Sequence, residues 1–315
     1  MVEIVAGELV RNEVTKNAMG GTELMATAMQ QKLPQELLKN FQIVHSRTRE
    51  LRDDLKKVLV CHDLAQDPEV QHLKDGGWNK YNKLVFVSQW QFQQYHDFLG
   101  VPYNHSHILK NSIDPIEHHQ KPDTDTIRII YHTTPHRGLN LLYVAFEELS
   151  KHNDNVELDV YSSFKIYGWE ARDEPYRELF QKLDNHPKIR YHGTVPNEEI
   201  RQALTQSHIF AYPSIWQETS CIALIEAMSA GCLCIHPNLA ALPETAANWT
   251  MMYQFHENMN IHANRFYAHL NAAVRDLQNK SVDSLAIYQN QKQYIDAFYN
   301  WDRRSSEWIQ FLSSI

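Results

Sequence analysis

The sequence predicts an α/β protein made of two doubly wound lobes of parallel sheet, with a ligand cleft between them. Three observations lead to this prediction. Short apolar runs alternate with amphipathic stretches along most of the chain, as in parallel sheets covered by helices. This alternation is interrupted once, by a stretch rich in proline and histidine over residues 105–126. The length of 315 residues suits two domains of ordinary size.

The first part of the chain is predicted to form four strands and two helices. The first helix carries Leu24, Ala28 and Leu33 on one side. The second helix should end at Gly100, because glycine tolerates the left-handed conformation that closes a helix. The strands are expected over residues 3–7, 41–45, 57–62 and 83–88, and the helices over residues 22–38 and 89–99.

Residues 105–126 are predicted to be a solvated linker. Three prolines lie in or beside this stretch, together with two adjacent histidines, Asp123 and Asp125. The alternation resumes after it, and the tail from residue 261 to residue 315 is expected to be helical. The later strands are predicted over residues 126–132, 156–162, 189–192, 209–213 and 232–236, and the later helices over residues 139–152, 175–185, 197–206 and 220–230.

The composition excludes several classes of protein. Hydrophobic residues make up 43% of the chain, which is enough for two cores and excludes intrinsic disorder. The 30 basic and 38 acidic residues give a net charge of −8, which argues against broad nucleic-acid binding. No apolar run is long enough for a transmembrane helix, and the first residues do not resemble a signal peptide. We therefore expect a cytoplasmic protein.

The cysteine and metal-ligand patterns indicate no redox or metal centre. The cysteines are expected to be reduced structural thiols, because their surroundings are apolar. Asp123 and Asp125 fall in the predicted linker, where a solvated turn is the better interpretation. His132 and His136 are separated by Pro135, so they do not form a helical metal-binding pair. The cysteines are Cys61, Cys221, Cys232 and Cys234.

Two acidic residues eight positions apart, Glu218 and Glu226, flank the start of the helix predicted over residues 220–230. Free backbone N–H groups at a helix start favour an anion. The two carboxylates could accept hydrogen bonds from the hydroxyls of an extended polyol. In the alternative interpretation, Glu218 interacts with the helix dipole and Glu226 lies on a solvated face. The residue types alone leave both interpretations open.

Glu218, Glu226 and the Ala-Met-Ser-Ala-Gly segment that follows resemble the Glu-x7-Glu signature of retaining GT-B glycosyltransferases, glycosyltransferase family four (group 1). Other segments resemble motifs of this family in order and spacing, and the resemblance is stronger in the second lobe. They are Gly20-Gly21-Thr22-Glu23, Asn111-Ser112-Ile113-Asp114, Pro135-His136-Arg137-Gly138, Tyr191-His192-Gly193-Thr194-Val195, and Trp301-Asp302-Arg303 with Trp308.

The resemblance implies a GT-B fold with three parts. Residues 1–116 would be a shortened, acceptor-side lobe, residues 117–290 the nucleotide-sugar lobe, and residues 291–315 a helix that returns to the first lobe. It implies metal-independent, retaining transfer of a hexose from a nucleoside-diphosphate sugar, with no cofactor, to a glycan, lipid or protein-linked acceptor. A glycoconjugate acceptor could bring the chain to a membrane surface.

The resemblance also implies the site residues. Glu218, Arg137 and His62 would be catalytic, Val195 would contact the base through its backbone, and Glu226 would accept from the ribose. The other residues expected at the donor are Gly20, Gly21, Thr22, His136, Lys165, Thr219, Ser220, Cys221 and Ile222. No metal ligand is implied, and Glu218→Gln or Arg137→Ala should each reduce transfer while leaving the fold intact.

Physical reasons support some of these residues independently. Gly20 and Gly21 would let backbone N–H groups approach phosphate oxygens, although a plain turn explains an isolated Gly-Gly equally well. Arg137 heads a predicted helix, where a guanidinium could hold a diphosphate, and otherwise it is a surface arginine. His62 follows a strand at the carboxyl edge of the first sheet, where it is either a ligand contact or a structural histidine.

Departures from the family pattern leave alternatives open. The short first lobe leaves the acceptor undefined, and the second phosphate cation is missing, with Lys165 and His136 as candidates. The acidic start of the helix at residues 197–199 favours a GDP-sugar such as GDP-mannose over a UDP-sugar, because guanine offers extra donors. The rival functions are a sugar-nucleotide epimerase and a non-catalytic nucleotide-sugar binding protein.

Overall fold

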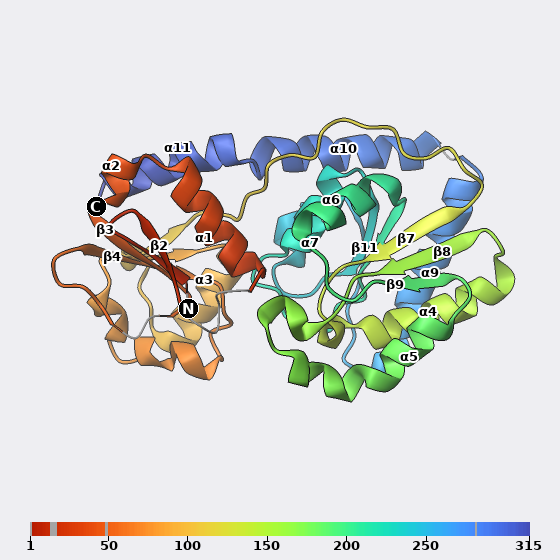
Figure 1. The fold of residues 1–315 in the computed structure, drawn as a ribbon, viewed down its shortest axis with the longest axis horizontal. Helices are drawn as coiled ribbons and strands as arrows, with labels where there is room; N and C mark the ends of the chain where they lie inside the picture. The colour runs from red at the N-terminus through yellow and green to blue at the C-terminus, as the bar shows by residue number, and fades with distance from the viewer. Residues whose placement is uncertain (1, 13–17, 48–49, 281) are drawn as a thin grey trace. The chain divides into compact units, whose positions relative to one another are not determined.

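The computed structural model describes residues 2–12, 18–47, 50–280 and 282–315. The chain divides into two compact units (Figure 1). The first unit comprises Met1–Asp114 and Phe298–Ile315, and the second comprises Pro115–Ala297. Each unit is built on one six-stranded sheet flanked by helices, which confirms the predicted fold class.

The first sheet has the strand order β2-β1-β3-β4-β5-β6. Strands β3 to β6 are parallel and follow one another in chain order, whereas β1 and β2 form an antiparallel hairpin at one edge. Ala6 and Gly7 both have positive φ, which is the conformation a two-residue hairpin turn needs. The strands are β1 (Val2–Val5), β2 (Glu8–Arg11), β3 (Phe41–His45), β4 (Lys56–Cys61), β5 (Lys83–Phe86) and β6 (Ser106–Ile108).

This hairpin corrects the predicted strand over residues 3–7, because the chain turns back at Ala6. The linker predicted from residue 105 also starts too early, since β6 lies within it. The single helix predicted over residues 22–38 is divided at Pro34, because a residue before proline disfavours the helical conformation. The helices of this unit are α1 (Gly21–Lys32), α2 (Gln35–Leu38), α3 (Gln89–Leu99) and α11 (Trp301–Ser313).

Helix α3 confirms its prediction at both ends. The Ser88 hydroxyl accepts from the backbone N–H of Gln91 at the start, and Gly100 closes the helix with φ +68°. Phe92, Tyr95 and Leu99 of this helix are buried against the sheet.

The second sheet is entirely parallel, with the strand order β12-β11-β10-β7-β8-β9. The first strand, β7, is central, and the order reverses between β7 and β10. This is the doubly wound arrangement, in which ligands bind at the carboxyl ends of the strands at the reversal. The strands are β7 (Ile127–Tyr131), β8 (Val156–Val160), β9 (Ile189–Tyr191), β10 (Ile209–Ala211), β11 (Leu233–Pro237) and β12 (Met251–Tyr253).

Helices cover both faces of this sheet, with α4, α5 and α9 on one side and α6 and α7 on the other (Figure 1). Helices α4 and α6 match their predicted ranges, whereas α8 and β12 were not predicted. Residues 175 and 176 belong to a 3-10 helix rather than to α5. The helices are α4 (Leu139–His152), α5 (Arg177–Asn185), α6 (Asn197–Gln206), α7 (Ile222–Ser229), α8 (Leu242–Ala246), α9 (Met259–Gln278) and α10 (Val282–Phe298).

The cysteines and the acidic turn behave as predicted. All four cysteines are buried and none forms a disulfide. Asp123 is almost fully exposed, and its contact is a 3.3 Å ion pair with Lys280. Among the described residues, no helix combines the length and apolar character needed to cross a bilayer.

Candidate functional site

Unpartnered polar atoms concentrate in the loops that follow the strands of the second sheet. Thirteen buried side-chain nitrogen or oxygen atoms lack a hydrogen-bond partner among the described residues, and eight of them lie in these loops. Buried polar groups are normally paired, so this edge is suited to a polar ligand that supplies the missing partners. The eight atoms are His132 Nε2, Thr133 Oγ1, Thr134 Oγ1, His136 Nδ1, Arg137 Nε, Ser162 Oγ, Thr194 Oγ1 and Ser220 Oγ.

Gly138 brings the loops after β7 and β10 into contact. Its φ is +114°, and a Cβ added there would lie 2.1 Å from the carbonyl oxygen of Pro213. A side chain at this position would therefore push the two loops apart. The glycine of the Pro135–Gly138 motif thus has a steric reason within this fold.

Arg137 and Glu218 meet where these two loops touch. Arg137 Nη1 lies 2.6 Å from Glu218 Oε1, and the Tyr212 hydroxyl donates to the same oxygen. Glu218 is only 4% exposed. Burial opposes the charge on Arg137, but the Glu218 carboxylate outweighs it and raises the pKa of Arg137 above its ordinary value. The two predicted site residues form a buried ion pair 81 positions apart in the chain.

Glu226 is also buried, so the interpretation that placed it on a solvated face is wrong. Asn197 Nδ2 lies 3.1 Å and 3.2 Å from the two carboxylate oxygens, and Arg201 Nη1 lies 3.3 Å from Oε1. Burial raises the pKa of Glu226, against the lowering effects of the Arg201 charge and the Asn197 hydrogen bonds. Arg201 was missed in the sequence, although Asn197 and Arg201 share a helix face at the i,i+4 spacing.

His136 is held between two aromatic rings. It stacks on Phe164 at 5.1 Å and meets the edge of Trp216 at 4.7 Å. Burial, with smaller effects from the charges of Arg137 and Arg172, lowers the pKa of His136 to about 4. The imidazole is therefore neutral at pH 7, and its prediction as the second phosphate cation is wrong.

The other predicted cation, Lys165, is 65% exposed and pairs with Glu170 at 3.3 Å. Arg172 is a third cation that the sequence did not single out. Its guanidinium lies 4.2 Å from the centre of the Trp169 ring, and its charge contributes to the lowered pKa of His136. Arg172 is therefore better placed than Lys165 to add positive charge at this edge.

The segment between Glu218 and α7 also belongs to this edge. The helix begins at Ile222 rather than at Ser220, and Cys221 precedes it without a side-chain cap. Cys221 is buried, which raises the pKa of its thiol and keeps it protonated. Thr219 and Ser220 are half-buried, and Val195 is half-buried in the loop between β9 and α6.

The remaining predicted residues lie in the first unit. Gly20 precedes α1, Gly21 is its first residue, and Thr22 is half-buried. His62 follows β4 and stacks on His45, with His45 Nδ1 and His62 Nε2 3.2 Å apart. Burial lowers the pKa of His62 to about 4. His45, at the end of β3, was not predicted as its partner.

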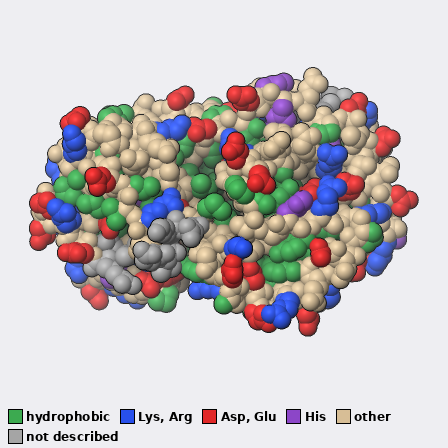
Figure 2. All heavy atoms as spheres, viewed as in Figure 1, with side chains coloured by type: hydrophobic (Ala, Val, Ile, Leu, Met, Phe, Trp, Pro, Cys, Tyr) green, Lys and Arg blue, Asp and Glu red, His purple; other side chains and the backbone are tan. Residues whose placement is uncertain are grey.

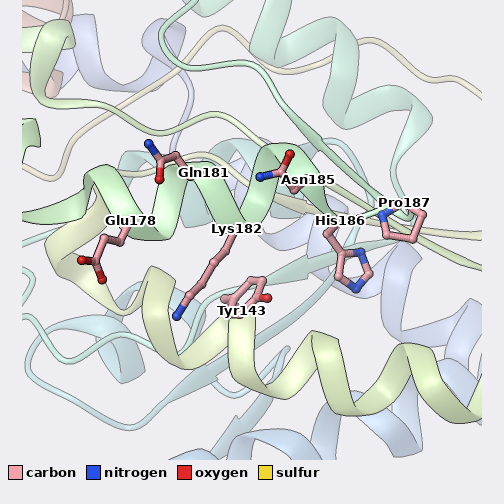
Figure 3. Close-up of a pocket in the computed structure, with 7 residues that line it drawn as sticks. All are labelled: Tyr143, Glu178, Gln181, Lys182, Asn185, His186 and Pro187. Atoms are coloured by element: carbon pink, nitrogen blue, oxygen red, sulfur yellow. The ribbon is translucent and has the colours of Figure 1, made fainter.

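A separate open groove of about 570 Å³ lies along helices α4 and α5 (Figure 3). It contains none of the residues above, and its lining is mixed in polarity. Figure 2 shows that basic and acidic side chains are interspersed on the face in view, with no continuous basic stripe among the residues described there. The residues that line the groove are Tyr143, Glu178, Gln181, Lys182, Asn185, His186 and Pro187.

Comparison with known families gives one family match. The model of the family described as "Glycosyl transferases group 1" matches residues 113–293. This range contains the ion pair, Glu226 and all eight unpartnered polar atoms.

Among curated relatives, a catalogued component of the phosphatidylinositol N-acetylglucosaminyltransferase of Homo sapiens is 25% identical over 141 residues, which is 44% of this chain and 28% of the relative. The GPI3 component of the enzyme of the same name from Saccharomyces cerevisiae strain YJM789 is 20% identical over 210 residues, 65% of this chain and 42% of the relative. The matched regions therefore span about a quarter to two fifths of the length of these relatives.

Solved structures share the fold. A glycosyltransferase from Rickettsia africae ESF-5 has a TM-score of 0.68 at 14% identity, with 98% of this chain and 84% of that chain covered. Anabaena Alr3699/HepE in complex with UDP-glucose has a TM-score of 0.67 at 13% identity, with coverage of 93% and 82%. At these identities the likeness shows the fold alone.

Proposed function

The chain belongs to the group 1 glycosyltransferases, and we propose that it transfers a hexose from a nucleoside-diphosphate sugar to a glycoconjugate acceptor, with retention of configuration and without a metal ion. The observation that carries this proposal is the buried pair of Arg137 and Glu218, set among unpartnered polar atoms where the strand order reverses. A diphosphate and a sugar would supply the acceptors and donors that these atoms lack.

Each residue at this edge has a proposed task. Arg137 uses Nη1 on Glu218, which leaves its unpartnered Nε for diphosphate oxygens and for the charge that develops as the diphosphate leaves. Glu218 and the backbone of residues 219–222 orient the sugar, Glu226 accepts from the ribose, and Val195 contacts the base. The leaving phosphate takes the acceptor proton, so no side-chain nucleophile is required.

The first-unit residues Gly20, Gly21, Thr22 and His62 keep the donor-binding roles that the family resemblance gives them. The buried stack of His62 on His45 leaves open whether His62 contacts a ligand or is purely structural. Loss of donor affinity in His62→Ala, with an unchanged melting temperature, would support the first alternative.

We propose a GDP-sugar, with GDP-mannose first, as the donor. The support is the acidic start of α6, where Glu198 and Glu199 are exposed beside the loop that holds Val195. The second candidate is UDP-N-acetylglucosamine, because the curated relatives are named as N-acetylglucosaminyltransferases and a matched structure contains UDP-glucose. Acceptors of the phosphatidylinositol class follow from the same names.

A nucleotide panel tests these proposals. Thermal shift with GDP, UDP and ADP should show stabilisation by one base, and that base's sugars are then assayed for hydrolysis and transfer. Stabilisation by UDP but not GDP would replace the first donor with the second. A donor converted to an isomer without an acceptor would indicate an epimerase, and binding without hydrolysis or transfer would indicate a non-catalytic protein. Activity that persists in EDTA is expected.

A further inference from the structure

Tyr212 lies just beyond the end of β10 and is completely buried. Its hydroxyl donates to Oε1 of Glu218, six residues further along the chain. Burial raises the pKa of Tyr212, so the phenol keeps its proton at neutral pH and acts as a donor. The sequence prediction included Tyr212 only as the end of a strand.

The carboxylate of Glu218 is fixed by two donors from different elements. Arg137 approaches from the loop after β7 and Tyr212 from the end of β10, and both reach Oε1. The terminal torsion of a glutamate is broad, so a single contact would leave the carboxylate free to turn. Two contacts to one oxygen set its plane, and Oε2 takes part in neither of them.

These two donors would respond differently to a bound diphosphate. The guanidinium of Arg137 is a cation, so phosphate oxygens would compete with Glu218 for it. The Tyr212 hydroxyl carries no charge and is enclosed in the core, so it would stay on Oε1 when Arg137 turns toward the phosphates. Tyr212 can therefore preserve the orientation of Glu218 in the loaded site.

We propose that Tyr212 is a positioning residue that holds Glu218 with Oε2 toward the donor sugar, where this oxygen accepts a sugar hydroxyl. The inference rests on the proposed function, and it adds a residue that acts on the sugar without acting on the nucleotide. Removal of its hydroxyl should therefore weaken binding and turnover of the complete donor and leave the affinity for the nucleoside diphosphate alone largely unchanged.

The test compares Tyr212→Phe with a matched control, Tyr253→Phe. Tyr253 belongs to the same unit, is also buried, and its hydroxyl pairs with His262 Nε2 at 3.2 Å without touching Glu218. Tyr212→Phe should lower kcat on the best donor by about 10- to 100-fold, as the loss of an orienting partner often does. Tyr253→Phe should keep near-normal turnover, with a similar small change in melting temperature.

A double variant separates positioning from general stability. If Tyr212 acts through Glu218, Tyr212→Phe/Glu218→Gln should be no slower than Glu218→Gln alone, and this comparison holds even if Tyr212→Phe alone folds poorly. Equal losses in Tyr212→Phe and Tyr253→Phe, or a further loss in the double variant, would overturn the inference. A wild-type chain that binds no nucleotide sugar would instead overturn the proposed function itself.

Discussion

Arg137 in the loop after β7 and Glu218 in the loop after β10 form a 2.6 Å ion pair at the reversal of strand order in the second sheet. The Arg137 side chain is 21% exposed and that of Glu218 5%, so the pair is largely removed from water. Removing one partner would leave a poorly solvated charge. The pair therefore has a structural role as well as the chemical role proposed for it.

A double-mutant cycle should show this structural role. Arg137→Ala and Glu218→Gln should each destabilise the second unit by about 1–3 kcal/mol, and the double variant by clearly less than the sum. This differs from the expectation from sequence alone, in which either change leaves the fold intact. Urea unfolding at pH 7 measures all four proteins. Strictly additive losses would mean that the two charges do not stabilise one another.

Arg137→Lys should separate charge from geometry. Lysine keeps the positive charge but lacks the planar fork that serves Glu218 and a phosphate together. We expect the KM for the donor to rise about tenfold, with a smaller effect on stability than Arg137→Ala. Steady-state kinetics with the best donor provide the measurement. Arg190→Lys is the control, because Arg190 forms a comparable fork with Asp159 at an exposed edge of the same sheet.

The sequence predicted strongly patterned elements well. Strand β3 and helices α3, α4 and α6 match their predicted bounds, because each has a clear period and a defined end. The β1–β2 hairpin was missed because its turn, Ala6-Gly7, lies inside an apolar run that looks continuous. Helix α1 was extended through Pro34 because its apolar spacing continues beyond the proline.

The site was predicted where a motif marks it and missed where a contact makes it. Arg137, Glu218 and Glu226 belong to recognisable motifs, whereas Tyr212 and Arg201 gain their roles only from hydrogen bonds that form after folding. His136 shows a different limit. Its residue type permits a positive charge, but burial between two rings decides that it is neutral, and burial cannot be seen in the local sequence.

Gly138→Ala should destabilise the second unit far more than an alanine at another glycine of positive φ. The added Cβ would overlap the carbonyl oxygen of Pro213, and φ is +114°, so we expect a loss of about 2–5 kcal/mol. Gly193 is the control, because it has φ +64° but no atom within 4 Å of an added Cβ. Gly193→Ala should cost only about 1 kcal/mol. Chemical unfolding of both variants measures the difference, and equal losses would show that strain, not contact with Pro213, governs Gly138.

Arg201→Gln should shift the pH dependence of nucleotide binding. Burial raises the pKa of Glu226 and Arg201 opposes this effect, so loss of the Arg201 charge should raise that pKa further. An ionised Glu226 accepts from ribose hydroxyls better than a protonated one. Affinity for the best nucleoside diphosphate should therefore be full above the Glu226 pKa and be lost as the pH falls through it, at a higher pH in Arg201→Gln than in the wild type. Calorimetric titration across the acidic range measures both curves.

Glu226→Gln is the control for this shift, because it removes the titrating group while the phosphates of the ligand titrate equally in every protein. Its binding curve should show only the change that the ligand itself causes. Stability should follow the same sign. The pKa of Glu226 is higher in the folded chain than in the unfolded chain, so the unfolded chain releases its proton first and wild-type stability falls, relative to Glu226→Gln, as the pH rises through this interval. Superimposable binding curves for wild type and Arg201→Gln would show that Arg201 does not control the ionisation of Glu226.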